Sequence, residues 1–176
     1  MEVDATLPQQ VLDWLGQVVI VQAADVTVEP GSWETFCVAV EDANLLYWDK
    51  AGAAALGPGL LAPPALMSAW TRPHPWSPAA QSEAVPRALE LHHRLKELLG
   101  YPLGIVLDVE SRFLLPLRPG DRVQAEQMLS HVGVEYSNRL GTGRDWSITV
   151  NYRRADGALV GQDVNRLFGY RRSESS

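Results

Sequence analysis

The stretch from Leu103 to the C-terminus constrains the fold most, because it reads as successive β-strands separated by turns. Apolar and polar residues alternate along "LGIVLDVESRFLLPLRPGDRVQAEQMLSHVGVEYSNR" and again along "DWSITVNYRRADGALVGQDVNRLFGYR". This alternation is typical of strands with one buried face. The segments "RPGDR" and "ADG" carry the Pro, Gly and Asp of tight turns. We therefore expect an antiparallel meander of about four strands.

The first half of the chain predicts mainly helices. Pro63 and Pro64 open an apolar run that reaches Trp70, where their missing N–H groups cost least, so we expect a largely buried helix there. Ser32 is expected to cap a helix that carries Phe36. The remaining expectations are short helices over 8–15 and 49–56, a strand over 18–29, a helix over about 86–99 and a disordered tail over 173–176.

This order of elements predicts an α+β fold in which helices pack on one face of an antiparallel sheet. The chain has 176 residues, which suits a single domain spanning 1–176. The proline-rich segment 71–86 does not resemble a domain linker, because no independent core precedes it. We interpret it as a long functional or covering loop.

Charge and composition exclude several classes of protein. The net charge is −6, which argues against a nucleic-acid-binding surface, since phosphate binding needs a positive field. No apolar run approaches the roughly 18 residues of a membrane span. The single cysteine, Cys37, permits no disulfide within the chain and suggests a reducing, cytoplasmic location. It lies in an apolar stretch and is expected to be an inert core residue.

The histidines do not form a metal-binding set. His92 and His93 are adjacent and would point in different directions from a helix, while His74 and His131 lie in a loop and on a strand. No HExxH motif or carboxylate cluster accompanies them. The chain also lacks a G-x-S-x-G motif and a complete dinucleotide-binding glycine pattern. We expect no metal and no cofactor.

Two polar clusters have both a structural and a functional interpretation. In "VEDANLLYWD", Asp42, Asn44 and Tyr47 follow a predicted helix closely; the carboxylate and amide can serve turns and caps, or they can belong to an active site. In "RLGTGRDW", Arg139 and Arg144 flank two glycines. They can be solvated arginines at a hairpin turn, or they can contact a coenzyme A phosphate.

Taken in order, these landmarks resemble the MaoC-like dehydratases of the N-terminal type, which have the hot-dog fold. The matching segments are "VEPGSWETFCVAVEDANLLYWD", "LLAPPALM", "FLLPLRPGDRV" and "GRDWSITVNYRRADGALVG", within residues 17–172. Within the family, the chain most resembles the MaoC-like part of the large subunit of bacterial steroid side-chain enoyl-CoA hydratases. The resemblance implies a hot-dog fold, in which an antiparallel sheet wraps around a central helix. It also implies hydration of the double bond of an enoyl-CoA substrate.

The resemblance also exposes two departures from a working active site. The family's catalytic loop reads Asp, any residue, Asn, Pro, aliphatic, His; here Asp42 and Asn44 match, but Leu45 replaces the proline and Tyr47 the histidine. A tyrosine with a pKa of about 10 is a poor proton acceptor at neutral pH. In catalytic halves, amides at the start of the central helix polarise the thioester, and the corresponding Pro63 and Pro64 have no N–H.

The resemblance therefore implies a non-catalytic half that binds substrate beside a second MaoC-like subunit carrying the Asp/His pair, in a heterodimer or heterotetramer. The segment 71–86 could make room for a bulky acyl group such as a steroid ring system. Ordinary core packing is the alternative role for the tryptophans. The candidate lining residues are Trp33, Trp48, Trp70 and Trp76.

Three other functions stay open at this point. One is a self-sufficient (R)-specific hydratase or 3-hydroxyacyl dehydratase that uses Asp42 with Tyr47 or His74. Another is a non-enzymatic protein that binds acyl thioesters. The last is a thioesterase. The sequence does not distinguish coenzyme A from an acyl-carrier protein.

Overall fold

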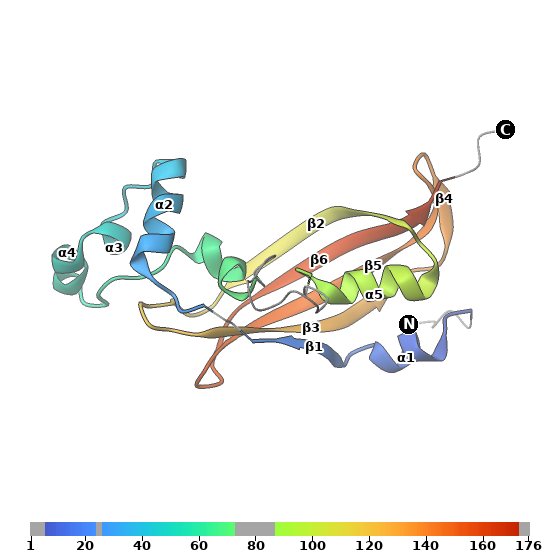
Figure 1. The fold of residues 1–176 in the computed structure, drawn as a ribbon, viewed down its shortest axis with the longest axis horizontal. Helices are drawn as coiled ribbons and strands as arrows, with labels where there is room; N and C mark the ends of the chain where they lie inside the picture. Colours follow the sequence, from blue (N-terminus) through green and yellow to red (C-terminus); the bar gives the residue numbers. More distant parts are fainter. Residues whose placement is uncertain (1–5, 24–25, 73–86, 173–176) are drawn as a thin grey trace, which may run out of the picture.

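The computed structural model describes residues 6–23, 26–72 and 87–172, and these form one antiparallel sheet with helices around it (Figure 1). The strand order is β1-β3-β5-β6-β2, with the short β4 beside β5. The strands are β1 (Val18–Gln22), β2 (Leu103–Phe113), β3 (Val123–Val132), β4 (Tyr136–Asn138), β5 (Gly141–Arg154) and β6 (Leu159–Arg171). The expected α+β class is confirmed.

The expected meander is wrong, although both expected turns exist. The "ADG" segment joins β5 to β6 in a hairpin, with Gly157 at a φ of 86°. The "RPGDR" segment also forms a tight turn, in which the Asp121 amide donates to the Arg118 carbonyl at 3.1 Å. The strands on either side of this second turn do not pair, because β2 pairs with β6 along its whole length and β3 lies beyond β5. A turn is local, whereas strand pairing depends on which apolar faces must be buried together.

The expected helices agree with the structure in position and differ in their ends, whereas the short helix at Leu45–Trp48 was not expected. Pro30 occupies the first turn of α2, so the helix begins before Ser32, which is not its cap. The apolar run after Pro63 forms a 3₁₀-helix, not an α-helix, and the strand expected over 18–29 ends at Gln22. The helices are α1 (Gln9–Trp14), α2 (Pro30–Val40), α3 (Leu45–Trp48), α4 (Lys50–Ala55), η1 (Pro64–Thr71) and α5 (Glu90–Leu99).

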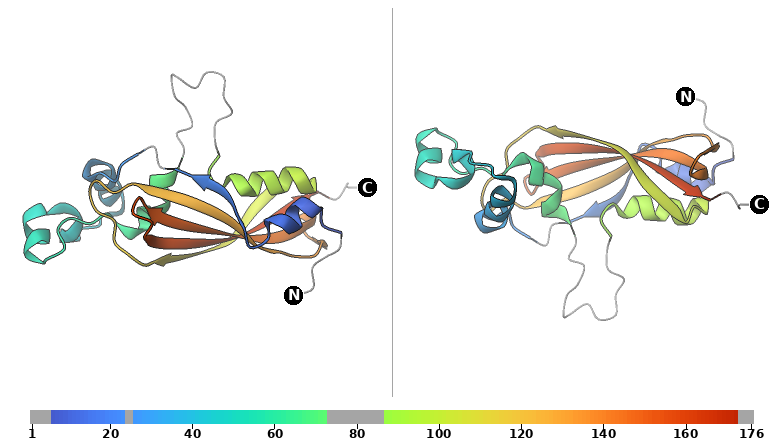
Figure 2. Two further views of the ribbon diagram at one scale, coloured as in Figure 1. Left: turned by 90° about the horizontal axis from the view of Figure 1, so that it is seen from below. Right: turned by 90° about the horizontal axis from the view of Figure 1, so that it is seen from above.

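Helix α5 lies against one face of the sheet, and α2–α4 extend beyond one end of it (Figures 1 and 2). Leu91 and Leu95 point from α5 into the core and are fully buried, as is Trp146 on β5. These side chains recur at the spacing of one helix face, which explains why this segment covers the sheet. Gly100 ends the helix in the left-handed conformation at a φ of 71°.

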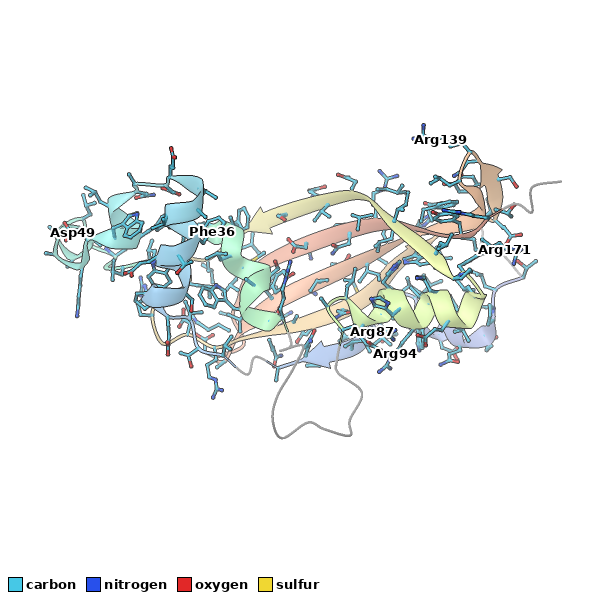
Figure 3. All side chains as sticks on the ribbon, turned by 45° about the horizontal axis from the view of Figure 1, so that its top comes forward. Phe36, Asp49, Arg87, Arg94, Arg139 and Arg171 are labelled. Carbon is cyan, nitrogen blue, oxygen red and sulfur yellow. The ribbon has the colours of Figure 1, made fainter. Side chains whose placement is uncertain are left out.

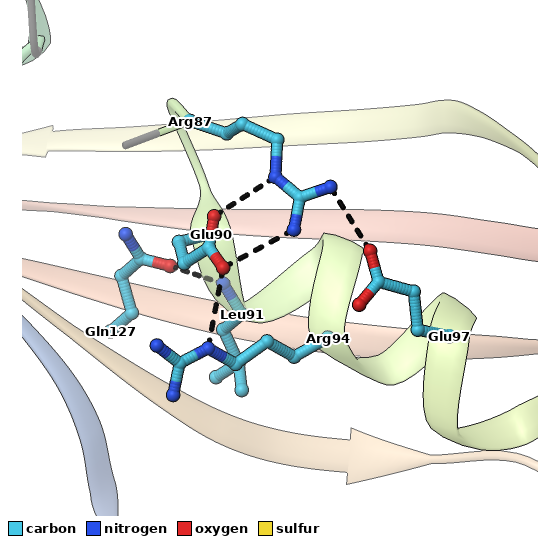
Figure 4. Close-up of polar contacts among 6 residues, drawn as sticks. All are labelled: Arg87, Glu90, Leu91, Arg94, Glu97 and Gln127. Atoms are coloured by element: carbon cyan, nitrogen blue, oxygen red, sulfur yellow. Dashed lines mark hydrogen bonds and ion pairs between the residues drawn. The ribbon is translucent and has the colours of Figure 1, made fainter. Parts of the chain in front are cut away.

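The sheet itself anchors the first turn of α5 (Figure 4). The buried Gln127 of β3 accepts a hydrogen bond from the Leu91 amide at 3.0 Å, which satisfies one of the free N–H groups at the start of the helix. Outside the core, Arg87 pairs with Glu90 at 3.0 Å and with Glu97 at 3.1 Å. Arg94 approaches Glu90 at 3.3 Å from the next turn.

The ion pairs of Glu90 make a contribution to stability that depends on pH. Hydrogen bonds from Arg87, followed by Arg94, hold the pKa of Glu90 below its ordinary value. A lowered folded-state pKa stabilises the fold above the unfolded pKa, and this stability disappears as the pH falls through the lowered value. We expect Glu90→Gln to lower the free energy of unfolding by about 0.5–1 kcal/mol at pH 7, and this loss should shrink to almost nothing once the pH lies below the lowered pKa of Glu90. Urea unfolding across this pH range measures the difference.

Glu97→Gln is the matched control, because its side chain is more exposed and meets a single arginine. We expect its effect to stay below about 0.5 kcal/mol at every pH. A Glu90→Gln effect that persists at low pH would show that packing, and not charge, makes this contribution.

Candidate active site

The loop after α2 is built by local hydrogen bonds. Glu41 adopts the left-handed conformation at a φ of 57°, and the Asp42 amide donates back to the Cys37 carbonyl at 3.0 Å, which closes the helix. The Asp42 carboxylate accepts the Asn44 amide at 3.0 Å. Asn44 in turn caps α3 by accepting the Leu46 amide at 3.1 Å. The turn and capping roles expected for these two side chains are therefore confirmed.

Tyr47 stands at the position where the resemblance expects a histidine. Burial and the nearby Asp42 carboxylate raise the pKa of its phenol above the ordinary value. The phenol therefore stays protonated at neutral pH and can donate a hydrogen bond, but it cannot accept a proton there. Its backbone carbonyl accepts the indole N–H of Trp33 at 2.9 Å, which fixes α3 on α2.

Trp48 of α3 also meets solvent, with 39% of its surface exposed. Its indole N–H donates to the Asp42 carbonyl at 2.6 Å. A hollow of about 470 Å³ lies beside it, lined by Cys37, Val38, Glu41, Asp42, Ala43 and Trp48. Cys37 itself is buried, and burial raises the pKa of its thiol, so the expectation of an inert cysteine is confirmed.

A second hollow lies at the start of η1. Pro63 precedes the helix and Pro64 begins it, so neither position offers an N–H to a ligand. The Leu66 amide is already bonded to the Pro63 carbonyl at 3.0 Å. The hollow measures about 150 Å³, and its walls are apolar, formed by Ala62 to Pro64, Met67, Phe113 to Leu117 and Val160.

The two hollows share no lining residue. Hydration of an enoyl thioester needs a proton-exchanging group and donors to the thioester oxygen that converge on one substrate. In this chain Asp42 and the start of η1 face different hollows. The resemblance implies that the central helix begins at Pro63 and Pro64. Helix η1 does begin there, but the α-helix that covers the sheet is α5, which begins only at Glu90.

The tryptophans and arginines have different environments from one another. Trp33 and Trp70 are buried in the core, so core packing describes them. Trp76 lies outside the described residues, as does His74. Arg139 extends into solvent from the β4–β5 turn (Figure 3). The expectation of a solvated or ligand-binding side chain is wrong for Arg144.

Arg144 is 7% exposed and tethers the N-terminal segment to the sheet. Its guanidinium donates to the Gly133 carbonyl at 3.0 Å and to the Thr6 hydroxyl at 2.9 Å. The turn signal in "RLGTGRDW" gave no indication of this burial, because Arg144 already lies inside β5. Its partners come from distant parts of the chain, so only tertiary structure could reveal them.

The histidines do not converge. His92 and His93 lie on α5 with their rings in a T-shaped arrangement and their centroids 5.4 Å apart. His131 is exposed on β3. Burial, followed by the nearby His93 and Lys96, lowers the pKa of His92 to about 4, so it is neutral at physiological pH. Among residues 6–23, 26–72 and 87–172, no three His, Cys, Asp or Glu side chains could hold a metal together. In the same part of the chain, no helix has the length and apolarity to cross a membrane.

Sequence reasoning missed a polar cavity on the sheet face that α5 only partly covers. It is lined by side chains that include Gln127 of β3 and both Asp163 and Asn165 of β6. The available signal was the alternation of β6, in which Gly161, Asp163, Asn165 and Leu167 share one face. A charged residue on the buried face of a strand is rare and calls for an explanation.

Comparisons with known proteins identify relatives of this fold. The family model described as "FAS1-like, dehydratase domain region" matches residues 13–161. The "Probable enoyl-CoA hydratase alpha subunit" of Thermomonospora curvata is 28% identical over 134 residues, which are 76% of this chain and 42% of that protein. The chain thus spans less than half the length of this curated relative.

Two solved structures share the fold. One is the ChsH1-ChsH2 complex from Mycobacterium tuberculosis, with a TM-score of 0.74 and 22% identity over 95% of this chain and 94% of the matched one. The other is a MaoC-like dehydratase with a TM-score of 0.58 and 20% identity, covering 88% of this chain and 42% of that one. The expected hot-dog fold and the resemblance to MaoC-like dehydratases are confirmed.

The loop geometry yields a direct test of the capping role of Asn44. Asn44→Ala removes the oxygen that accepts the Leu46 amide, so we expect a loss of about 1 kcal/mol in the free energy of unfolding. Asn44→Asp keeps a capping oxygen and should unfold like the wild type. Thermal and urea unfolding measure both variants. Equal losses for the two would mean that the side-chain amide nitrogen, and not the cap, holds the loop.

Proposed function

We propose that this chain, which belongs to the FAS1-like dehydratase domain family, is the non-catalytic, substrate-binding half of a heteromeric enoyl-CoA hydratase. The family relationship rests on a model that matches most of the chain. The enoyl-CoA hydratase and MaoC-like dehydratase class is supported by that family and by the named relatives. The division of labour between two subunits is our proposal.

The observation that carries the proposal is the phenol of Tyr47 at the family's histidine position. Addition of water across an enoyl thioester requires a group that takes a proton from water and another that returns a proton to the α-carbon. A tyrosine whose pKa is raised by burial and by Asp42 does not exchange protons near neutral pH. Asp42 alone would have to perform both steps, and its carboxylate is already engaged with the Asn44 amide.

The prolines at η1 support the same conclusion through the resemblance, which places the thioester donors at this position although the α-helix that covers the sheet is α5. Neither Pro63 nor Pro64 can donate a backbone hydrogen bond to a thioester oxygen. Loss of one such donor lowers the rate of the catalysed reaction by roughly two to three orders of magnitude. A partner subunit that carries both an Asp/His pair and intact amides would supply these groups. The ChsH1-ChsH2 complex is itself an assembly of two proteins, which supports a two-subunit arrangement.

The edge strand β2 offers the surface for that partner. It is an end strand of the sheet, hydrogen-bonded to β6 along one side. An unpaired edge with apolar side chains is a template for pairing with another strand. We propose that an edge strand of the partner hot dog pairs here and continues the sheet. The exposed apolar residues of this edge and the turn after it are Val106, Leu107, Val109, Phe113, Leu114 and Leu115.

The substrate we propose is a bulky acyl-CoA, such as a steroid side-chain enoyl-CoA. Two apolar or mixed hollows flank η1, and the helix that covers the sheet starts only at Glu90. The space between η1 and α5 could admit a large acyl group. The apolar walls at Pro63 and Pro64 are the proposed contacts for the acyl group. Trp48 lines the separate hollow beside Asp42, and Arg139 lies at the end of the sheet opposite α2–α4 (Figure 3), so we propose neither as a contact of this acyl-CoA.

Hydration of a trans-2-enoyl-CoA, followed as loss of enoyl absorbance, tests the division of labour. We expect the chain co-expressed with a small MaoC-like subunit to hydrate the substrate at least about 100-fold faster than the chain alone. Asp42→Ala in the mixture should leave the rate nearly unchanged, because the partner supplies the proton chemistry. The partner alone is the control for activity that does not need this chain.

Activity of the purified chain alone, abolished by Asp42→Ala, would contradict the proposal and identify a self-sufficient hydratase. Binding of thioesters without turnover in any mixture would instead identify a non-enzymatic binding protein.

A charge on the β2 edge tests the proposed interface. We expect Val106→Lys to weaken association with the partner at least about tenfold, because the lysine would be buried without a counter-charge. Val134→Lys is the matched control, since Val134 is similarly exposed, at 65% against 59%, but lies in the β3–β4 connection. Sedimentation measures association, and urea unfolding should find both variants as stable as the wild type. Normal assembly of Val106→Lys would place the interface elsewhere.

A further inference from the structure

A cavity of about 240 Å³ lies between the end of η1, the start of α5 and the sheet. One side is formed by Ser68, Thr71 and Arg72 at the end of η1, and another by Ala88 and Leu89 just before α5. Its floor consists of side chains from the strands. These are Gln22, Val109, Ala125, Gln127, Val150, Asp163 and Asn165.

The floor holds a buried carboxylate with a free oxygen. Asp163 is 8% exposed, and its Oδ2 accepts the hydroxyl of the buried Tyr152 at 2.8 Å. Its Oδ1 is buried and has no hydrogen-bond partner among the described residues. A buried carboxylate oxygen without a hydrogen-bond donor costs roughly several kcal/mol of stability. A fold therefore retains one only where a donor, such as a ligand group, can bond to it. Tyr152 cannot serve both oxygens, because a phenol has one proton to donate.

The rest of the lining limits what that partner can be. The Oε1 of Gln127 is occupied, since it accepts the Leu91 amide. Leu89, Val109, Ala125 and Val150 supply apolar surface, whereas Gln22, Ser68, Thr71 and Arg72 are polar, so the walls are of mixed character. Arg72 lies at the rim and is exposed, close enough to influence Tyr152 electrostatically, so a cationic ligand is disfavoured. A neutral group that donates one hydrogen bond from an apolar body fits these walls and this floor.

We propose that this cavity binds the distal end of the acyl group and that Asp163 accepts a hydrogen bond from a hydroxyl on it. This inference rests on the proposed function, because it treats the cavity as part of the acyl-binding half. A hydroxyl donates to the carboxylate oxygen, whereas a ketone would set two acceptors against each other. The carboxylate therefore selects a hydroxylated ring over its oxidised form, and a buried acceptor discriminates strongly against a group that cannot donate.

Calorimetric titration of the full chain with three free acids tests this selection without requiring turnover. The probes are 5β-cholanic acid, its 3-hydroxy form and its 3-oxo form, which differ only at the distal ring. We expect the wild type to bind the hydroxy acid at least about tenfold more tightly than the oxo acid. Asp163→Asn still accepts from Tyr152 but presents an amide N–H₂, which can donate to a ketone. It should therefore lose this preference or reverse it.

Tyr152→Phe is the control, because it removes the phenol that holds Asp163 but keeps the carboxylate. The preference for the hydroxy acid should survive in this variant, and circular dichroism establishes that both variants are folded. The inference is overturned if the wild type binds the hydroxy and oxo acids equally, which is the result expected if an ordered water occupies Oδ1. It is also overturned if none of the three acids binds. Either result leaves the hydration experiment with the partner subunit to decide the proposed function separately.

Discussion

The packing of α5 on the sheet is the contact on which the rest of this structure depends. Leu91 and Leu95 bury one helix face in the core, and Gln127 of β3 accepts the Leu91 amide from the sheet below. These contacts fix where the helix starts as well as where it lies. Because α5 begins only at Glu90, a cavity lies between its start and the end of η1, as far as the described residues show. The proposed acyl site is thus a direct consequence of a late helix start.

The Asp42 loop shows how a structural role and a catalytic role can use the same residues. The resemblance implies that, in a working active site, the aspartate and a histidine hold the water. Here the side-chain oxygens of Asp42 and Asn44 accept the backbone amides of Asn44 and Leu46, which shapes the turn and caps α3. The turn therefore does not depend on the residue at position 47, where the resemblance expects a histidine. Local backbone satisfaction preserves the loop, whereas proton exchange depends on the one side chain that has changed.

The two proposed interaction sites lie in different parts of the sheet and have different chemistry. The β2 edge offers unpaired backbone and exposed apolar side chains, which suit another strand. The cavity offers walls of mixed polarity and a buried acceptor at Asp163, which suit a compact ligand. β2 contributes to both, since its Val109 lines the cavity. Pairing at the edge could therefore influence how tightly the cavity is closed.

The sequence by itself determined the α+β class, the helix positions within a few residues, the two tight turns and the replacement of the family histidine by Tyr47. These features depend on local patterns: alternation, proline at helix starts, and turn residues. It could not determine that β2 and β3 lie apart, that Arg144 is buried against Gly133 and Thr6, or that Asp163 forms the floor of a cavity. Each of these depends on residues distant in the chain, and only the tertiary structure decides which distant residues meet. Strand pairing follows the burial of whole faces, and no short segment contains that information.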